Sequence, residues 1–172
     1  LIPMGSAYHK WIAGWNNEFT FKGLNLSFLI DGKWGGKIFS ATDYYGYLFG
    51  LHKATLVDRE KNFGTTASPI DAATYYSTLA SNVSRLFVQD ASFIKFRQLA
   101  LGYTIPVKAF RNVVQSLNIS LVARNLFTIM KRTDNIDPEA NYSSTDRGLT
   151  QGLELGGVPP IRTMGINLNV RF

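Results

Sequence analysis

The sequence predicts an all-β chain whose strands form part of the wall of an antiparallel transmembrane β-barrel. Three observations support this fold class. Apolar and polar residues alternate over about five long segments, the connections between these segments are alternately short and long, and no run approaches 18 consecutive apolar residues. Short turns at one end of the strands and long loops at the other are typical of membrane barrels.

The first predicted element is a β-hairpin in the stretch WNNEFTFKGLNLSFLIDG. Apolar residues fall on one parity before Lys22-Gly23 and on the other parity after it, and glycine supplies the positive φ that a tight hairpin turn needs. We expect the second strand to continue through KWGGKIFSATDYYGY, with a bend or bulge at Gly32, Gly35 and Gly36.

The middle of the chain alternates between long loops and strands. Residues 48–89 lose the strand period and are predicted to form a loop with one short helix, residues 71–79, which Asp71 is placed to begin. The next strand, in ASFIKFRQLALGYTIP, ends at Pro106, and a short link leads to a strand in LNISLVARNLFTI. Residues 131–160 form the second predicted long loop.

The last predicted strand is the stretch MGINLNVRF, which alternates without a break. Its apolar face, which we expect to point to lipid, consists of Met164, Ile166, Leu168, Val170 and Phe172. The opposite face consists of Thr163, Gly165, Asn167, Asn169 and Arg171. This length suits a tilted strand that crosses a bilayer. Alternation alone does not separate this interpretation from a half-buried strand of a soluble β-sandwich.

Composition excludes several classes of function. The chain of 172 residues is 45% hydrophobic and 17% charged. This composition is typical neither of a disordered chain nor of membrane helices. Its net charge is +6, but the 18 lysines and arginines never form a run longer than two, so no nucleic-acid partner is expected. The absence of cysteine excludes disulfides, thiolate zinc sites and cysteine nucleophiles.

No arrangement of residues predicts catalysis or a resident cofactor. His9 and His52 lack metal-binding partners at suitable spacing, and we expect both at the surface or in an aromatic girdle. The stretch DNIDPEAN, with Asp134 and Glu139, offers oxygen ligands for Ca²⁺, but it lacks the EF-hand spacing and glycine, so a solvated turn is expected. We therefore predict no enzyme, no catalytic residue and no metal site, and substrate-binding residues are not identified.

Two tyrosine pairs are candidates for ligand contact. Tyr44-Tyr45 and Tyr75-Tyr76 lie in or near the first predicted long loop. Aromatic rings there suit stacking against an amphipathic ligand such as a sugar. Packing within the loop or in a girdle explains the same residues and is the preferred interpretation.

Several stretches together resemble one known family. They are FTFKGLNLSFLIDGKWGGKIFSA, GLHKATLVDRE, DASFIKFRQLALGYTIP, ARNLFTIMKRTDNIDPEAN and GGVPPIRTMGINLNVRF. In this order they resemble the C-terminal portion of the SusC/RagA family of TonB-dependent outer-membrane transporters, and the match covers nearly the whole chain. The strand DASFIKFRQLALGYTIP, the pair RNLFT and DPEAN, and the closing strand with its aromatic residue are the most specific parts.

The resemblance implies a place and a role for the chain. Residues 1–172 would be the C-terminal strands of a barrel of about 22 strands in the bacterial outer membrane, with extracellular loops at about 48–89 and 131–160 and with the plug domain and N-terminal strands absent. The parent would import glycans or peptides. Its partners would be a SusD-like surface lipoprotein, the TonB complex through the missing N-terminal region, outer-membrane lipid and the barrel-assembly machinery, which would read the last strand and its Phe172.

One alternative from another class stays open. A soluble β-sandwich that binds carbohydrate would also show alternating strands and aromatic residues. In that case the apolar face of the last strand would form a water-free core between two sheets, and the chain would fold in buffer without detergent.

Overall fold

The computed structural model describes residues 2–106, 115–140, 142–144 and 148–171. These residues form two compact units. The first unit, which we call the wall sheet, comprises Trp11–Trp34 and the described parts of Phe93–Lys131 and Pro160–Phe172. The second unit, which we call the loop unit, comprises residues 2–10 and the described parts of Gly35–Ser92 and Arg132–Pro159.

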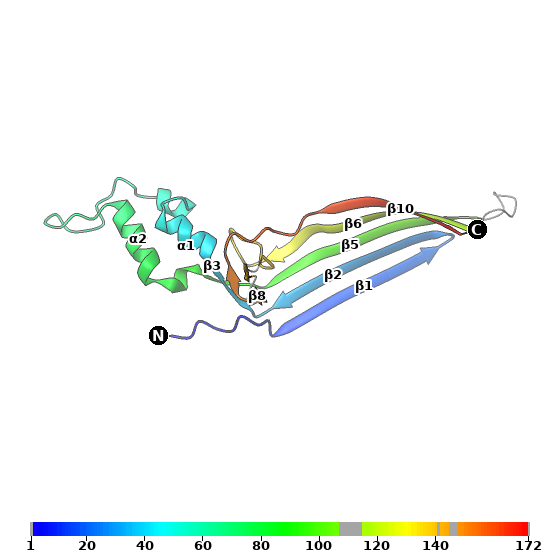
Figure 1. The fold of residues 1–172 in the computed structure, drawn as a ribbon, viewed down its shortest axis with the longest axis horizontal. Helices are drawn as coiled ribbons and strands as arrows, with labels where there is room; N and C mark the ends of the chain where they lie inside the picture. Colours follow the sequence, from blue (N-terminus) through cyan, green and yellow to red (C-terminus); the bar gives the residue numbers. More distant parts are fainter. Residues whose placement is uncertain (1, 107–114, 141, 145–147, 172) are drawn as a thin grey trace. The chain divides into compact units, whose positions relative to one another are not determined.

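The wall sheet is a five-stranded antiparallel sheet in the order β1-β2-β5-β6-β10, and its strands run side by side in Figure 1. Its strands are β1 (Trp11–Phe21), β2 (Leu24–Trp34), β5 (Phe93–Ile105), β6 (Ser116–Lys131) and β10 (Thr163–Arg171). The prediction of about five long antiparallel strands is confirmed, and their closure into a barrel stays a prediction. The link between β5 and β6 lies mainly outside the described residues.

The hairpin of β1 and β2 turns at Lys22-Gly23, as the sequence predicts. Both residues have positive φ, 48° and 86°, the backbone geometry of the type I′ turn that matches the twist of the flanking strands. A Cβ on Gly23 would lie 2.9 Å from the carbonyl oxygen of Thr104 on β5. Glycine is therefore required both by the turn and by the approach of the neighbouring strand.

The wall sheet contains bulges that re-align its faces. Arg97 is an extra residue in β5, since its neighbours Phe96 and Gln98 pair with the consecutive residues Ile30 and Leu29 of β2. The pairing of β5 with β6 shifts at the same place. An extra residue reverses which side chains point to which face, so apolar positions on both sides of Arg97 remain on one face of the sheet.

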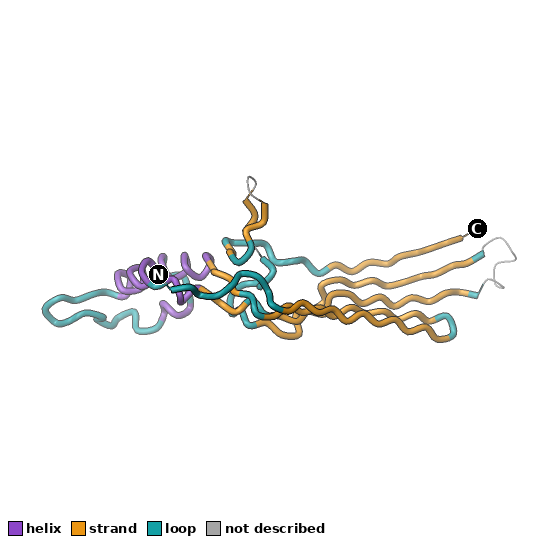
Figure 2. The backbone as a smooth tube through the Cα atoms, turned by 90° about the horizontal axis from the view of Figure 1, so that it is seen from below, coloured by secondary structure: helices purple, strands orange, loops and turns teal. Residues whose placement is uncertain are grey.

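The loop unit contains all the helices of the described chain and three short strand pairings (Figure 2). Its helices are α1 (Ala41–Leu48), η1 (Lys53–Leu56), α2 (Ala72–Asn82) and η2 (Ser84–Phe87). Its strands are β3 (Lys37–Ser40), β4 (Val88–Asp90), β7 (Tyr142–Ser144), β8 (Gly148–Thr150) and β9 (Leu153–Glu154). In the sheet β4-β3-β9, β9 runs parallel to β3, and β7 pairs with β8.

The expected continuation of the second strand through KWGGKIFSATDYYGY is wrong. β2 ends at Trp34, Gly35 has a φ of 83°, and the chain then enters the separate sheet at β3. Ser40 caps α1, because its Oγ accepts a hydrogen bond of 3.0 Å from the backbone N–H of Asp43. The chain therefore leaves the wall sheet before the predicted loop boundary near Leu48.

The helix predicted within the first loop is present as α2, slightly longer than expected. Asp71 is its N-cap, and its Oδ1 accepts a hydrogen bond of 2.8 Å from the backbone N–H of Thr74. None of the helices in the described chain is long and apolar enough to cross a membrane.

The core of the loop unit joins segments that are far apart in sequence. Ile38 of β3, Ala91 and Ile136 are buried against one another, and Phe87 is fully buried under aromatic neighbours. Burial of these side chains supplies the hydrophobic stabilisation that the two predicted loops need in order to fold together. Both predicted loops thus fold into one structured unit rather than forming two separate loops.

Candidate functional site

The predicted lipid-facing residues of the last strand lie together on one face of β10. Met164, Ile166, Leu168 and Val170 pair with Ala123, Leu121, Ile119 and Leu117 of β6. The side chains of Met164 and Ile166 are 71% and 75% exposed. Phe172 lies outside the described residues.

The apolar face of β10 continues across all five strands. Pairing register and alternation place the following apolar or aromatic residues on this face: Trp11, Ala13, Trp15, Phe19, Phe21, Leu24, Leu26, Phe28, Ile30, Trp34, Ile94, Phe96, Leu99, Leu101, Tyr103, Ile105, Leu117, Ile119, Leu121, Ala123, Phe127, Met164, Ile166, Leu168 and Val170. Gly32 and Asn17 share the face, and none of these positions is charged.

This apolar face is uncovered in the described chain. Many of its large side chains are exposed, including Trp11, Phe19, Leu121 and Ile166. An exposed apolar surface that extends over a whole sheet is rare on soluble monomers and marks contact with a membrane or a partner. The water-free core that a soluble sandwich requires on this face is absent from the described residues.

Aromatic side chains cross the apolar face in a row. Ring centroids are 5.4 Å apart between Trp15 and Phe28, 6.0 Å between Phe28 and Phe96, and 5.3 Å between Phe96 and Phe127. These rings come from four adjacent strands, β1, β2, β5 and β6. Ring pairs at such distances stabilise the sheet beyond the area that they bury.

The dimensions of the apolar face fit a bilayer. β2 has 11 residues, which extend about 36 Å at about 3.3 Å per residue and rise about 28 Å at a tilt of about 40°. Aromatic residues mark both ends of this strand, with Trp34 paired to Trp11 at one end and Leu24 between Phe21 and Tyr103 at the other. An apolar band about 25 Å tall between aromatic girdles is the pattern of outer-membrane barrels.

The opposite face of the wall sheet is mainly polar, and its side chains form hydrogen bonds across strands. Thr20 Oγ1 donates to Asn25 Oδ1 at 3.0 Å, and Asn25 Nδ2 donates to Thr104 Oγ1 at 3.3 Å. Asn118 Nδ2 donates to the same Thr104 oxygen at 2.9 Å. One face is therefore suited to hydrocarbon and the other to water or to a plugged lumen.

A charged cluster on the polar face is centred on the bulge. The guanidinium of Arg97 binds the carboxylate of Asp31 through Nη2 at 2.8 Å and through Nε at 3.1 Å. Arg97 Nη1 also donates to Asn125 Oδ1 at 3.2 Å, and Asn125 Nδ2 donates to the carbonyl of Ile161 at 3.1 Å. This cluster ties β2, β5 and β6 to the segment that enters β10.

Sequence reasoning missed this bulge, although a signal for it is present. Apolar residues occupy even positions at Ile94 and Phe96 but odd positions at Leu99 and Leu101. A strand that keeps one apolar face can change parity only through an inserted residue. The change of parity around Arg97 is that signal.

The loop unit contains two buried carboxylates, of which Asp43 lies in the first turn of α1 and Glu154, in β9, binds to that turn. Glu154 is 2% exposed and accepts four hydrogen bonds, from Ser40 Oγ, Thr42 N, Thr42 Oγ1 and Gly157 N, at 2.7 to 3.3 Å. Because Glu154 belongs to the second predicted loop and Ser40 and Thr42 lie just before the first, its carboxylate joins the second loop to the start of α1.

Asp43 is the second buried carboxylate. It is 6% exposed and accepts hydrogen bonds from Gln89 Nε2 at 2.5 Å and from Asn135 Nδ2 at 2.9 Å. His52 Nε2 lies 3.7 Å from Asp43 Oδ1, while His52 Nδ1 accepts from the backbone N–H of Ala54 at 3.1 Å. The proton of neutral His52 is therefore on Nε2, toward Asp43.

Of the two locations expected for the histidines, the surface or an aromatic girdle, the surface is wrong for His52. Its side chain is 13% exposed, and its ring stacks on Tyr47 with centroids 4.8 Å apart. His9 is half-buried, and its Nε2 lies 3.3 Å from the carbonyl oxygen of Ala91. Both rings contribute to packing of the loop unit.

The tyrosine pairs mainly pack inside the loop unit, as the preferred interpretation predicts. Tyr44 contacts Phe39 and Phe87, and Tyr75 stacks on Phe63 with centroids 4.2 Å apart. Tyr45 is an exception, because it is exposed and stacks on another exposed ring, Phe49.

The acidic stretch considered for Ca²⁺ makes protein contacts. Asp134 Oδ2 binds Lys53 Nζ at 2.6 Å, and Asp137 Oδ1 accepts from the backbone N–H of Glu139 at 2.8 Å. Across the described residues, no group of three or more histidine, aspartate or glutamate side chains could hold a metal ion.

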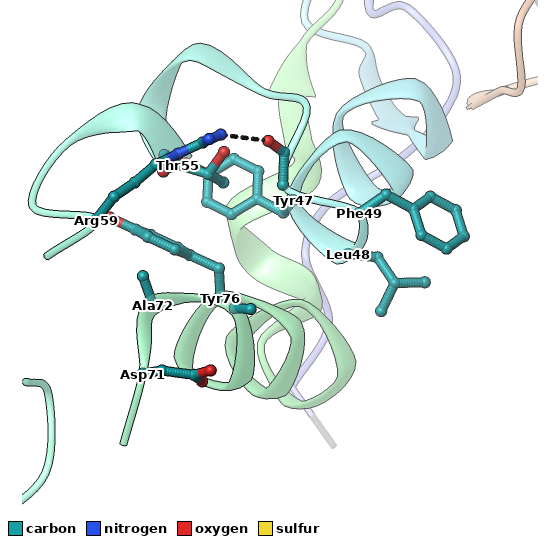
Figure 3. A pocket seen from close by; sticks show the side chains of 10 residues that line it. Tyr47, Leu48, Phe49, Thr55, Arg59, Asp71, Ala72 and Tyr76 are labelled. Carbon is teal, nitrogen blue, oxygen red and sulfur yellow. Dashed lines mark hydrogen bonds between the residues drawn. The ribbon is translucent and has the colours of Figure 1, made fainter. Parts of the chain in front are cut away.

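A pocket of about 430 Å³ lies between the end of α1 and the start of α2 (Figure 3). Its lining includes Tyr47, Arg59, Asp71 and Tyr76. Burial, then the nearby Tyr76 and Asp43, raises the pKa of the Tyr47 hydroxyl, so this group stays neutral at physiological pH. Sequence reasoning named Tyr76 but did not identify Arg59 and Asp71 as neighbours of one cavity.

Comparisons with known proteins agree with this geometry. No family model matches the chain. The chain is 27% identical to TonB-dependent receptor P3 of Formosa agariphila and 28% identical to TonB-dependent receptor P26 of the same organism. These alignments cover 98% and 99% of the chain but only 17% and 18% of the two receptors.

Solved structures of transporters share the fold. The RagAB peptide importer in its closed-closed state aligns with a TM-score of 0.69 and 19% identity, over 96% of this chain and 17% of the other. The open-open state of the same importer aligns with a TM-score of 0.65 and 21% identity, over 94% of this chain and 17% of the other.

By sequence the chain is similar to the class of TonB-dependent receptors, and it spans less than a fifth of the length of the two receptors that it matches. Within that class the chain is similar to the SusC/RagA-type transporters, as the sequence predicts. The outer-membrane location that the sequence predicts agrees with these comparisons.

Proposed function

We propose that the chain forms the C-terminal wall and outer loops of a TonB-dependent nutrient importer of the outer membrane. The observation that carries the proposal is the uncharged apolar face, which continues across all five strands opposite a hydrogen-bonded polar face. Lipid would cover the first face, and the lumen of a closed barrel of about 22 strands would lie against the second.

In this importer the chain would form part of the barrel wall and of its outer loops, and it would catalyse no reaction. The wall sheet would separate hydrocarbon from the lumen, and the loop unit would lie on the extracellular side, where a SusD-like lipoprotein and a glycan or peptide substrate would meet it. The plug domain and the contact with TonB would belong to parts of the parent outside this chain. The names of the similar receptors and of the RagAB importer support this assignment.

The last strand would also serve assembly of the barrel. β10 is an edge strand in the described sheet, so its free edge is available to pair with the first strand of a closed barrel. We propose that Met164, Ile166, Leu168, Val170 and Phe172 are read by the barrel-assembly machinery before that closure.

Two adjacent substitutions in the full-length parent test the wall assignment. Ile166→Arg places a charge on the apolar face, and Asn167→Arg places the same charge on the polar face of the same strand. Near the bilayer midplane, arginine on a lipid-facing position costs about 2 to 4 kcal/mol, whereas a lumen position tolerates it. We expect Ile166→Arg to reduce the folded, membrane-inserted fraction strongly and Asn167→Arg to leave it near that of the unchanged protein.

The readout is the amount of folded protein in purified outer membranes and its urea midpoint in detergent-free vesicles. The side chains of Ile166 and Asn167 are both exposed in the wall sheet. If both faces were in contact with water, the two variants would therefore have the same stability. Equal behaviour of the two variants would contradict the assignment of the apolar face to lipid.

A further inference from the structure

His52 lies between two groups of the loop unit that favour opposite charge states of its ring. Its Nδ1 accepts a hydrogen bond of 3.1 Å from the backbone N–H of Ala54, which requires that this nitrogen carries no proton. Its Nε2 lies 3.7 Å from Oδ1 of Asp43, and a carboxylate at this distance favours the positively charged imidazolium. The ring therefore has one partner for each of its two charge states.

The hydrogen bond from Ala54 is the side-chain cap of η1. His52 is the N-cap residue, and Ala54 occupies the second helical position, whose N–H has no acceptor within the helix. The carbonyl oxygen of His52 also accepts from the backbone N–H of Thr55 at 2.9 Å and from its Oγ1 at 2.7 Å. Neutral His52 thus fixes the start of η1 through both its side chain and its backbone.

η1 in turn positions contacts of the rest of the loop unit. Lys53 Nζ binds Asp134 Oδ2 at 2.6 Å, which links η1 to the second predicted loop. The carbonyl oxygen of Thr55, a buried residue, accepts from Nε of Arg59 at 3.0 Å. A change at the cap of η1 therefore affects contacts within both predicted loops.

The ring of His52 is held in place on its other sides. It stacks on Tyr47 with centroids 4.8 Å apart, and the side-chain amides of Gln89 and Asn135 hold the carboxylate of Asp43. The ring also lines a cavity of about 400 Å³ beside the exposed side chains of Phe49 and Leu51, from which protons of the solvent can reach it.

The charged and titratable groups around the ring come from each element packed against it. Burial raises the pKa of the Tyr47 hydroxyl, and the hydrogen bond to Asp134 raises the pKa of Lys53, so neither group changes its charge between pH 5 and 8. The full set is Asp43 and Tyr47 of α1, Lys53 of η1, Arg59 after η1, Tyr76 of α2 and Asp134 of the second loop.

We propose that His52 is a pH-sensitive cap of η1: the neutral ring holds η1 through Ala54, and the protonated ring releases η1 and binds Asp43. Protonation places a hydrogen on Nδ1, so that two N–H donors face each other and the hydrogen bond from Ala54 is lost. The same proton gives the ring a positive charge, which draws Nε2 toward the carboxylate of Asp43.

Mild acidification is sufficient for this change, because histidine is the side chain whose charge ordinarily changes between pH 5 and 8. The imidazolium keeps Asp43 and Tyr47 as neighbours, so the loop unit stays folded while η1 loosens. The inference does not rest on the importer assignment, because it concerns contacts within the loop unit alone.

The test is amide hydrogen exchange of the full-length protein in detergent, measured by mass spectrometry at pH 8, 7, 6 and 5 and corrected for the intrinsic pH dependence. We expect the corrected exchange of residues 53–57 to be about two- to tenfold faster at pH 5 than at pH 8, the effect of one lost hydrogen bond. Exchange of the carbon-bound Cε1 proton of His52, measured in the same samples, reports the charge of the ring. The two transitions should have the same midpoint.

Two variants assign the effect to this histidine. His52→Asn keeps an acceptor at the N-cap but does not titrate, so exchange of residues 53–57 should be equal at pH 8 and pH 5. His9→Asn is the matched control. Nε2 of His9 lies 3.3 Å from the carbonyl oxygen of Ala91, a contact that requires an N–H on this nitrogen and therefore survives protonation. This variant should retain the pH effect at η1.

Three results would overturn the proposal: equal exchange of η1 at pH 8 and pH 5, a midpoint that differs from that of the His52 ring, or a pH effect that persists in His52→Asn. Exchange of residues 77–82 of α2 should stay constant, and faster exchange there at pH 5 would mean general unfolding and would equally contradict the proposal. The comparison of midpoints uses the unchanged protein, so it remains decisive even if a variant is less stable.

Discussion

Glu154 shows how a single buried side chain can join two segments that are distant in sequence. Each of its carboxylate oxygens faces one backbone N–H, Oε2 facing that of Thr42 and Oε1 facing that of Gly157. A carboxylate satisfies both donors because it offers only acceptors. The residue thus fixes the second loop to the first turn of α1. Its donors among the described residues are hydroxyl and backbone N–H groups, and none of them is a cation.

This geometry predicts the result of the most conservative substitution at that position. In Glu154→Gln the amide NH₂ must replace one oxygen, and in either orientation it meets a backbone N–H donor. An unsatisfied buried donor costs about 1 to 3 kcal/mol. We expect faster amide hydrogen exchange at residues 40–43 and 154–157, measured by mass spectrometry on the full-length protein.

A matched control exists in the same unit. Glu60 is exposed, and Glu60→Gln changes the net charge by the same amount without altering a buried contact. Its exchange should equal that of the unchanged protein. Equal exchange in Glu154→Gln and Glu60→Gln would show that the buried carboxylate does not hold the second loop to the start of α1.

The face on which a strand residue lies could be predicted from the sequence. The partners of a buried side chain such as Glu154 could not. Alternation identified Met164, Ile166, Leu168 and Val170 as one face, because strand geometry depends only on local spacing. Two partners of Glu154, Ser40 and Thr42, lie 114 and 112 positions away, and no local pattern encodes such a contact. The residues that line the pocket between α1 and α2 come from separate segments and were missed for the same reason.

Among the elements, α2 has a cap whose strength depends on pH. Hydrogen bonds from Thr74 lower the pKa of Asp71 below its ordinary value. A carboxyl group with a lowered folded-state pKa stabilises the fold above its unfolded-state pKa of about 4, and this contribution is lost as the pH falls through the folded-state value.

We therefore expect protection of the first turn of α2 to be constant from pH 8 to about 5 and to decrease below about pH 4. The measurement is hydrogen exchange of residues 72–76, corrected for the intrinsic pH dependence of exchange. Asp71→Asn should remove the pH dependence while keeping protection at neutral pH. Protection that rises on acidification would contradict the role of the ionised cap.

Element prediction succeeded where turn chemistry was explicit and failed where a cap was overlooked. Lys22-Gly23 defined the hairpin and Asp71 defined the start of α2, because both depend on short-range backbone geometry. The helix α1 was expected as a strand, although Ser40-Ala-Thr-Asp43 is a helix-start pattern. Its aromatic residues favour strands, and the cap outweighed that preference.

At the scale of the whole molecule, the wall sheet has two unpaired edges. In the described chain β1 and β10 are the outer strands, and each has a neighbour on only one side. Five strands are fewer than the roughly eight of the smallest membrane barrels. In hydrocarbon, open edges leave backbone N–H and C=O groups without partners, at a cost of several kcal/mol for each group.

The isolated 172-residue chain should therefore depend on its surroundings. In plain buffer we expect aggregation or disorder, because the apolar face meets water, and in detergent we expect β-structure without a sharp thermal transition, because the edges stay open. Circular dichroism combined with size-exclusion chromatography in buffer and in detergent measures both. A monodisperse β-protein that melts cooperatively in buffer would instead mean that the apolar face closes a core of its own, and a soluble binding module would replace the importer wall as the better assignment. Addition of the remaining strands of the parent should restore cooperative, heat-resistant folding, because pairing at β1 and β10 then satisfies both edges.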